Sequence, residues 1–397
     1  MSKGILDGVI VLDLTRVLAG PYSSMLLADM GATVYKIEQP KKGDDSRAFG
    51  PFVNGESAYY MNLNRNKYGV TLNLKAPEGK EIFKEMVKKA DVVLENYRPG
   101  TMEKLGLGYE TLKEINPGIV YGCVSGFGHY GPYSKRAGYD IIGQAMGGLM
   151  STTGWPEGGP TRTGTAMGDV LGGLGVTIGV LAAVINKVKT GEGQKVDVSL
   201  VDSVVSSLEI ITQIYLATGR IPGRIGNRYE SAYPYDSFKA KDGDVIIGCG
   251  NDKLYELLVE AMNQPELLTD ERFKTNALRV QNHVVLKEII ENWTTQYEID
   301  EIVESLLEKG VPSCPINTID RLVKDPHIAV AREMFVDVKH PVAGETTLTG
   351  NHIKLSDKKA EIKTPAPTLG QHNYDVYGGF VGISKEKIDE YIEKGVM

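Results

Sequence analysis

The sequence has few cysteines and histidines, and neither residue type is grouped. Its three cysteines, Cys123, Cys249 and Cys314, lie far apart, which fits neither a disulfide framework nor the spacing of a zinc site. The six histidines contain no HExxH pair. We therefore expect neither a disulfide framework nor a bound metal.

Nucleotide-binding motifs are also missing. The chain contains no GxGxxG and no GxxxxGK[ST], so we do not expect dinucleotide binding of the usual kind or P-loop chemistry. With a net charge of -7 and no run of basic residues, nucleic acid is not an expected partner. The first residues lack a secretory segment because Asp7 and Asp13 interrupt the apolar stretch. We expect a cytoplasmic protein.

The first part of the chain alternates strand and helix patterns in the manner of a parallel sheet. This order predicts an α/β fold in which each strand delivers a loop to one edge of the sheet, where such proteins bind ligands. Later, residues 252–309 read as amphipathic helices of a smaller domain, 335–355 alternate as strands, and a last helix follows Ser384. The predicted strands are 9–14, 33–38, 70–74, 91–95 and 119–125, and the predicted helices are 21–30, 77–89 and 105–115.

One acidic residue, Asp169, stands at the start of an apolar segment, residues 170–185. Apolar side chains cover every face of this predicted helix, so it is buried all round or lies in lipid. At roughly 16 residues the run falls short of a bilayer span, and we expect no membrane contact. Four glycines, at 172, 173, 175 and 179, predict close approach of another backbone or a ligand.

The position of Asp169 has two interpretations. Its side chain can cap the free N–H groups of the helix. Alternatively, the positive end of the helix dipole keeps its carboxylate ionised in a dry site, where it can act as a nucleophile. Position and composition do not choose between the two.

The loops of the first part carry basic and aromatic residues that the net charge conceals. A single lysine at the end of a strand is usually only solvated, but several at one sheet edge predict a ligand with clustered phosphates and an aromatic base. The residues in question are Arg65, Lys67, Lys75, the segment 96–100, Lys104, Lys135 and Arg136.

Together, several short blocks resemble the class III CoA-transferases, the family that contains the formyl-CoA:oxalate and carnitine CoA-transferases. The blocks occur in order, with similar spacing, over nearly the whole chain. They read DG at 7–8, AGP at 19–21, GATVYKIE at 31–38, ENYRPG at 95–100, GFG at 126–128, GD at 168–169, GEGQKV at 191–196, GVP at 310–312, KDP at 324–326 and PAPTLGQH at 365–372.

The resemblance implies an architecture and a cofactor requirement. A large Rossmann-like domain with a parallel sheet would be built from both chain ends, 1–222 and 336–397. A smaller α+β domain with linkers would occupy 223–335, and two chains would form an intertwined homodimer of interlocked rings. No cofactor would be bound permanently, because coenzyme A enters as the acyl-CoA substrate.

The resemblance also implies a mechanism. Asp169 would attack the donor thioester to form a mixed anhydride, and CoA would then be exchanged through an aspartyl-CoA thioester, moving CoA from an acyl-CoA to a carboxylic acid. Lys75, Arg98, Lys104 and Arg136 would bind phosphates. The complete set of CoA contacts implied is Leu18, Ala19, Gln39, Leu72, Asn73, Leu74, Lys75, Asn96, Tyr97, Arg98, Lys104, Arg136, Ala137, Gly138 and Asp140.

Tyr139 separates this reading from its main alternative, an α-methylacyl-CoA racemase or epimerase. Racemases of this superfamily usually have a histidine in the block that reads AGYD here, and a tyrosine with a normal pKa of about 10 is a poor base. Tyr139 is therefore expected to orient a carboxylate. His129 is a candidate substitute base, although a loop histidine is more often structural. A CoA-binding regulatory protein without turnover is a third possibility.

The chain departs from the oxalate-type enzymes in two places. Gln39 stands where they have a basic residue, and their glycine-rich flap has no tetraglycine counterpart. The corresponding region is 226–235 or 248–251. The acyl donor and the acceptor acid cannot be read from these residues.

Overall fold

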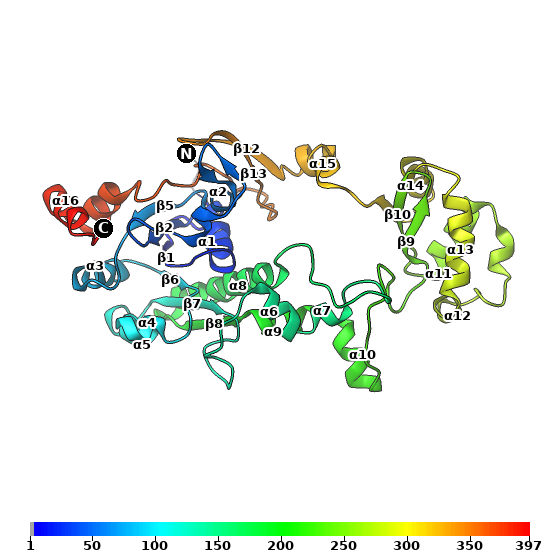
Figure 1. Cartoon of the computed structure of the whole chain (residues 1–397), viewed down its shortest axis with the longest axis horizontal. Coiled ribbons are helices and arrows are strands. Elements are labelled where there is room, and N and C mark those ends of the chain that lie inside the picture. Colours follow the sequence, from blue (N-terminus) through cyan, green and yellow to red (C-terminus); the bar gives the residue numbers. More distant parts are fainter. Residues whose placement is uncertain (1–3) are drawn as a thin grey trace. The chain divides into compact units, whose positions relative to one another are not determined.

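The computed structural model describes residues 4–397 and divides into two compact units (Figure 1). The first unit contains the described part of Met1–Leu149, Arg162–Ala217 and Pro326–Met397, and the second contains Met150–Thr161 and Thr218–Asp325. Against the expected division, residues 150–161 and 218–222 group with the second unit and 326–335 with the first. The first difference arises because Arg224 and Gly226 bond the carbonyl groups of Gly158 and Gly154, at 2.6 and 3.0 Å.

A six-stranded sheet, in which all neighbouring strands are parallel, forms the centre of the first unit, as the alternating pattern predicted. The strands β2 and β5 lie on one side of β1, and β6, β7 and β8 lie on its other side. The chain adds strands outward from the centre on the first side and then on the second. The loops after β1 and β6 therefore diverge, which opens a crevice at the carboxyl ends of these strands. In spatial order the strands are β5 (Tyr68–Thr71), β2 (Thr33–Glu38), β1 (Ile10–Asp13), β6 (Val92–Glu95), β7 (Val120–Ser125) and β8 (Lys195–Ser199).

Helices cover both faces of this sheet, so its strands are apolar on both sides. One face packs on α1 (Ala19–Asp29) and α8 (Met167–Thr190), and the other on α3 (Pro77–Val87) and α16 (Lys385–Glu393). The predicted helix 105–115 is divided into α4 (Thr101–Leu105) and α5 (Tyr109–Ile115), because Gly106 takes a left-handed conformation, φ 71°, and ends α4.

The long helix α8 confirms the expected close approach at its glycines. A side chain at Gly173 would place its Cβ 2.6 Å from the carbonyl oxygen of Ala19, so only glycine allows α1 to cross here. The prediction that residues 170–185 are buried all round is wrong for the single chain, because Ile178 and Ile185 are 67% and 57% exposed. Length and composition alone would let α8 cross a membrane, although its inner face packs on α1 and β7 in this structure.

Shorter elements complete the first unit. A hairpin of β12 (Phe335–His340) and β13 (Gly344–Thr349) confirms the predicted strands, and α16 begins after Ser384 as expected. The others are η1 (Asp45–Ala48), β3 (Phe52–Val53), β4 (Glu56–Ser57), α2 (Ala58–Asn64), α6 (Asp140–Met146), α9 (Leu200–Ser207), α10 (Ile210–Thr218), η3 (Pro326–Ala331) and η4 (Asp375–Val381). All of α7 (Leu149–Thr152) except Leu149 belongs to the second unit.

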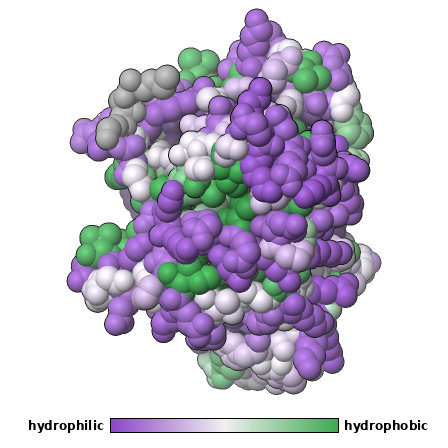
Figure 2. All heavy atoms as spheres, turned by 90° about the vertical axis from the view of Figure 1, so that its left-hand side faces the viewer, coloured by the Kyte–Doolittle hydropathy of each residue, from purple (hydrophilic) through white to green (hydrophobic). Residues whose placement is uncertain are grey.

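Figure 2 shows the end of the first unit that carries α3 and α16. This face is mostly hydrophilic with a hydrophobic area near its centre. A groove between the two helices is lined by Ile82, Val381, Ile383 and Tyr391, with glutamates of α3 along its border.

The second unit combines a small antiparallel sheet with amphipathic helices, as predicted for 252–309. Leu258, Ile290 and Leu306 are completely buried in its core. Its elements are β9 (Tyr235–Ala240), β10 (Gly243–Gly248), α11 (Asp252–Met262), η2 (Pro265–Leu268), α12 (Asn276–Gln281), α13 (His283–Thr294), α14 (Ile299–Glu308), β11 (Ser313–Pro315) and α15 (Ile319–Leu322).

Candidate active site

A cavity of about 180 Å³ lies in the crevice between the loops that follow β1 and β6. The start of α8 and the loop after β7 complete its wall, and every lining residue belongs to the first unit. The lining residues are Arg16, Val17, Leu18, Ala19, Asp45, Asn96, Tyr97, Arg98, Pro99, Val124, Ser125, Gly126, Arg136, Ala137, Gly138, Tyr139, Asp169 and Leu200.

Asp169 reaches this cavity because another carboxylate caps its helix. Asp140 Oδ1 accepts the backbone N–H groups of Gly168 and Asp169, at 2.8 and 3.3 Å. Within the described chain, no donor is bonded to the Asp169 carboxylate itself. The interpretation of Asp169 as the helix cap is therefore wrong, and its side chain is free to react.

Burial raises the pKa of Asp169 to about 7, and the nearby negative charge of Asp140 adds to this effect. At neutral pH the carboxyl group is therefore divided between its protonated and ionised forms, so the expectation that Asp169 stays ionised is met only in part. Tyr59 also lies near this charge, and burial together with Asp169 raises the pKa of Tyr59 to about 12.

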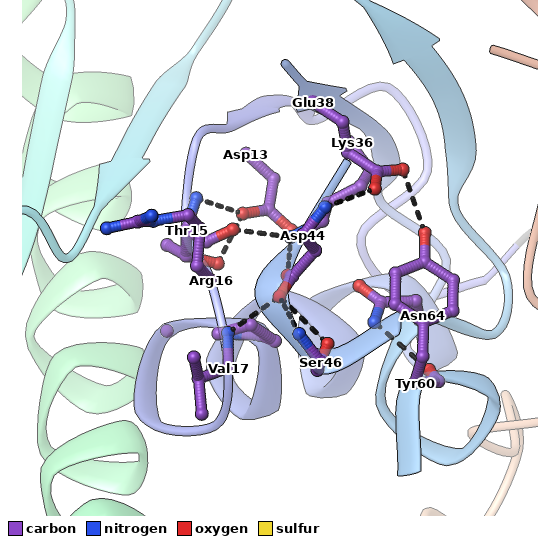
Figure 3. Close-up of polar contacts among 12 residues, drawn as sticks. Asp13, Thr15, Arg16, Val17, Lys36, Glu38, Asp44, Ser46, Tyr60 and Asn64 are labelled. Carbon is purple, nitrogen blue, oxygen red and sulfur yellow. Dashed lines mark hydrogen bonds and ion pairs between the residues drawn. The ribbon is translucent and has the colours of Figure 1, made fainter. Parts of the chain in front are cut away.

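The loop of residues 15–18 forms one wall of the cavity in a strained conformation (Figure 3). Val17 has a φ of 67°, in the left-handed region that a β-branched residue rarely enters and that costs about 1–2 kcal/mol. The side chain of Asn96 holds this loop from the β6 side. It accepts from the backbone N–H of Arg16 and donates to its carbonyl, at 2.8 and 2.7 Å.

The opposite wall depends on two glycines. A side chain at Gly126 would place its Cβ 2.6 Å from the Cα of Gly138, so the loop after β7 closes on itself only with glycine at both positions. Arg136 stacks on Tyr133 with its guanidinium carbon 3.6 Å from the ring centroid. Tyr139 is 75% exposed at the start of α6, where a substrate can reach its hydroxyl group.

Three arginines, Arg16, Arg98 and Arg136, line the cavity. Arg16 pairs with Asp45 at 2.9 Å, and its guanidinium lies over the Tyr97 ring at 5.3 Å. Its Nε is buried without a hydrogen-bond partner. An unpaired buried donor is costly, so this atom is available to a bound acceptor.

Most of the expected site residues meet at this cavity. Ten of them line it: Leu18, Ala19, Asn96, Tyr97, Arg98, Arg136, Ala137, Gly138, Tyr139 and Asp169. Gln39 lines a smaller neighbouring cavity of about 80 Å³ that shares Arg16 and Tyr97 with the first. Asp140 acts through the cap. The other five, Leu72, Asn73, Leu74, Lys75 and Lys104, do not line either cavity.

These five residues lie elsewhere for local reasons. Leu72 is 2% exposed and belongs to the hydrophobic core between the sheet and α3. The backbone N–H groups of Asn73 and Lys75 bond to Val396 O and Asn73 Oδ1 in the turn before α3. Leu74 packs against the same core, and the Lys104 side chain on α4 is exposed.

Two basic residues of the expected phosphate cluster are not available to a ligand. Arg65 is 1% exposed and pairs with Asp29 at 2.8 Å. Lys67 is 2% exposed and bonds to Asp13, Ser24 and Asn64. Buried charges require partners, and these two side chains obtain theirs inside the fold.

His129 lies behind the cavity and does not line it. Its Nδ1 is 3.0 Å from Lys195 Nζ and its Nε2 is 3.6 Å from Glu95 Oε1. Lys195 donates to Nδ1, so the ring proton is on Nε2. Glu95, Cys123 and His129 are close enough to share a metal ion, and His129 Nε2 is buried without a hydrogen-bond partner. The geometry does not support His129 as a substitute base.

The sequence did not single out several residues at this site. Arg16, Val17 and Asp45 line the cavity, and Tyr59 lies close to Asp169. The one local signal for Arg16 and Val17 was their position directly after β1, at the same sheet edge as the loops already selected.

We predict that Asp140→Asn lowers the pKa of Asp169 below about 7, because the substitution removes a negative charge and keeps an oxygen that can cap α8. The ¹³C shift of the Asp169 carboxyl group, assigned by its loss in Asp169→Asn, would be titrated in both proteins. Asp389→Asn on α16 is the control. An unchanged midpoint in Asp140→Asn would show that burial alone sets this pKa.

Comparisons with known proteins agree with this geometry. A model described as CoA-transferase family III matches residues 6–373. The chain is 39% identical over 397 residues to succinyl-CoA:glutarate CoA-transferase from Homo sapiens, covering 99% of this chain and 90% of that protein. It is 41% identical over 371 residues to acetyl-CoA:oxalate CoA-transferase from Acetobacter aceti, covering 93% and 94%.

Solved structures show the same fold. A CaiB/BaiF family protein from Brucella suis superposes with a TM-score of 0.85 at 38% identity, over 95% of this chain and 100% of that one. The resemblance carried by the short sequence blocks is therefore confirmed over most of the chain. This protein belongs to CoA-transferase family III and is a CoA-transferase.

Proposed function

We propose that the enzyme moves CoA from an acyl-CoA to a free carboxylic acid through covalent intermediates on Asp169. The observation that carries this proposal is that Asp169 lines the cavity with its carboxylate unbonded, because Asp140 caps the helix in its place. A buried carboxylate with no donor to stabilise it is a reactive nucleophile.

The reaction balances without water or a nucleotide. Asp169 attacks the thioester carbonyl, the C–S bond breaks, and CoA leaves as a thiolate from a mixed anhydride. The thiolate attacks the aspartyl carbonyl, which releases the donor acid and leaves an aspartyl-CoA thioester. The acceptor carboxylate attacks this thioester to form a second anhydride. The thiolate then takes the new acyl group and restores Asp169.

Residues of the cavity wall have distinct roles in this scheme. Asn96, Tyr97 and Arg98 after β6 contact CoA, and Tyr139 orients a carboxylate at the start of α6. Because Asp169 must be ionised to attack, the rate of the first step increases as the pH rises through about 7 and falls below it.

The acids exchanged are proposed to be dicarboxylic. The similar proteins are named for succinyl-CoA with glutarate and for acetyl-CoA with oxalate, so each name includes at least one dicarboxylic acid. In this cavity the buried, unpaired Nε of Arg16 can donate a charge-assisted hydrogen bond to the second carboxylate. The α-methylacyl-CoA racemase alternative has less support, since the cavity lining of the described chain includes no histidine to serve as a second base.

We also propose that the working enzyme is the intertwined homodimer. Apolar side chains on α8 and α10 have no cover in the single chain, and Ile178, Ile185 and Leu216 are 67%, 57% and 71% exposed. Such uncovered apolar surface marks a protein interface. We expect a native mass of twice 43.3 kDa by light scattering after gel filtration. The mass of one chain in an active sample would contradict the dimer.

The covalent mechanism predicts that hydroxylamine traps an acyl-enzyme at Asp169. Incubation with succinyl-CoA and hydroxylamine should convert Asp169 to a hydroxamate, detected by mass spectrometry of the peptide. Asp169→Asn should form none and lose activity by at least about a thousandfold. Asp140→Asn, in which the nucleophile remains, is the matched control and should still be trapped. An active preparation with unmodified Asp169 would refute the mechanism.

The dicarboxylate assignment predicts a preference for glutarate over butyrate as acceptor. Removing the Arg16 charge in Arg16→Gln should lower kcat/KM for glutarate by about tenfold or more, and the value for butyrate much less. Arg98→Gln should reduce both values alike, because Arg98 is assigned to CoA. Equal effects of Arg16→Gln on the two acids would contradict the assignment.

A further inference from the structure

A buried ion pair lies directly behind the 15–18 loop that lines the cavity (Figure 3). Lys36 is in the middle of β2, and the side chains of Lys36 and Asp44 are both 0% exposed. The Lys36 ammonium donates to Asp44 Oδ2 at 2.8 Å and to the carbonyl oxygen of Thr15. Lys36 is buried between Tyr35 and Ile37 of β2, and a buried lysine calls for an explanation beyond packing.

Asp44 carries the contact from this lysine to Val17. Its Oδ1 accepts the backbone N–H of Val17 at 3.1 Å, and also the N–H and hydroxyl group of Ser46 at 2.9 and 2.8 Å. The carboxylate therefore joins the 15–18 loop to the start of η1. Its position is fixed from both sides, by Lys36 and by Ser46.

These bonds end at the residue that is strained. Val17 keeps a left-handed φ of 67° although it is β-branched, and such a conformation persists only where its surroundings impose it. Arg16, Val17 and Leu18 all line the cavity that contains Asp169. A relaxed Val17 would turn this wall, and the adjacent Arg16, away from their present positions.

We propose that the Lys36–Asp44 pair positions the substrate wall by holding Val17 in its left-handed conformation. The proposal rests on the assignment of this cavity to the acyl-CoA substrate. The pair touches no reacting atom, so Lys36 and Asp44 are positioning residues that act through the backbone of the 15–18 loop. A buried ion pair generally contributes little net stability, so stability alone does not explain this one. Its hydrogen bonds end at the strained backbone beside the nucleophile.

A glycine at position 17 provides the cleanest test. Val17→Gly keeps every hydrogen bond of the backbone and removes both the strain and the restriction of φ. Because glycine adopts a positive φ at little cost, Val17→Gly should keep the binding shape, so KM and the dissociation constant for acyl-CoA should stay within about twofold of the wild type and Tm should not fall. Lys41→Gly relieves a similar φ of 65° at an exposed position outside the cavity and should change neither constant.

A second pair of variants tests the ion pair itself. Asp44→Asn removes the charge of the carboxylate that bonds Lys36 and Val17, while Asp13 and Glu38 still face the Lys36 charge. It should raise KM by about tenfold, whereas kcat should change less. Asp29→Asn breaks another buried pair, with Arg65, which is away from the cavity lining. It should lower Tm and leave KM unchanged. In Val17→Gly, the added Asp44→Asn change should raise KM less than it does in the wild type.

Two results would overturn the proposal. One is wild-type KM and CoA affinity in Asp44→Asn, or in Lys36→Met should Asp44→Asn fail to fold. The other is a double variant in which Asp44→Asn raises KM by the same factor in Val17→Gly as in the wild type. Direct titration of CoA by calorimetry measures binding without turnover. If either of these results is found and hydroxylamine still traps Asp169, only the positioning role is rejected. If hydroxylamine traps nothing at Asp169, the covalent mechanism itself is rejected.

Discussion

The capping of α8 by Asp140 is the interaction on which the chemistry of the site depends. A helix N-terminus requires an acceptor for its free N–H groups, and Asp169 stands where it could supply one. Because Asp140 bonds the N–H groups of Gly168 and Asp169, the carboxylate of Asp169 is left unbonded in the cavity. The same cap brings a second negative charge close to Asp169. One residue therefore both frees the nucleophile and raises its pKa.

The strand order places this helix end opposite two diverging loops. Since β1 lies between β2 and β6, the chain segments that leave β1 and β6 turn to opposite sides, and Asn96 links them by its two bonds to the backbone of Arg16. The crevice is thus a consequence of topology. Its detailed shape is not, because the Val17 conformation is imposed by side chains from β2 and η1.

Local periodicity accounts for what the sequence predicted well. The strands, the helix after Asp169 and the loops at one sheet edge all follow from short-range patterns. Long-range pairing escaped prediction: Arg65 and Lys67 look like ligand-binding residues until Asp29 and Asp13 are found beside them, 36 and 54 residues away. Asp140 was expected to contact CoA, and its role as a cap for residues 28 and 29 positions later has no local signal. The exposed face of α8 reflects a hydrophobic surface that a single chain does not cover.

The distribution of charge explains why the reactive acid is poorly stabilised. Lys36 and Lys67 are buried near the cavity, but Asp44 and Asp13 neutralise them at 2.8 and 3.1 Å, so neither supplies a net positive field. Arg98 and Arg136 are exposed, so water screens their charge, and Arg16 is paired with Asp45. Among the described residues of the first unit, no positive group is found to offset the burial of Asp169, and its pKa rises to about 7. An acid whose pKa lies near the working pH remains partly ionised, and its anion is more basic than an ordinary carboxylate. That basicity makes the anion a stronger nucleophile toward a thioester.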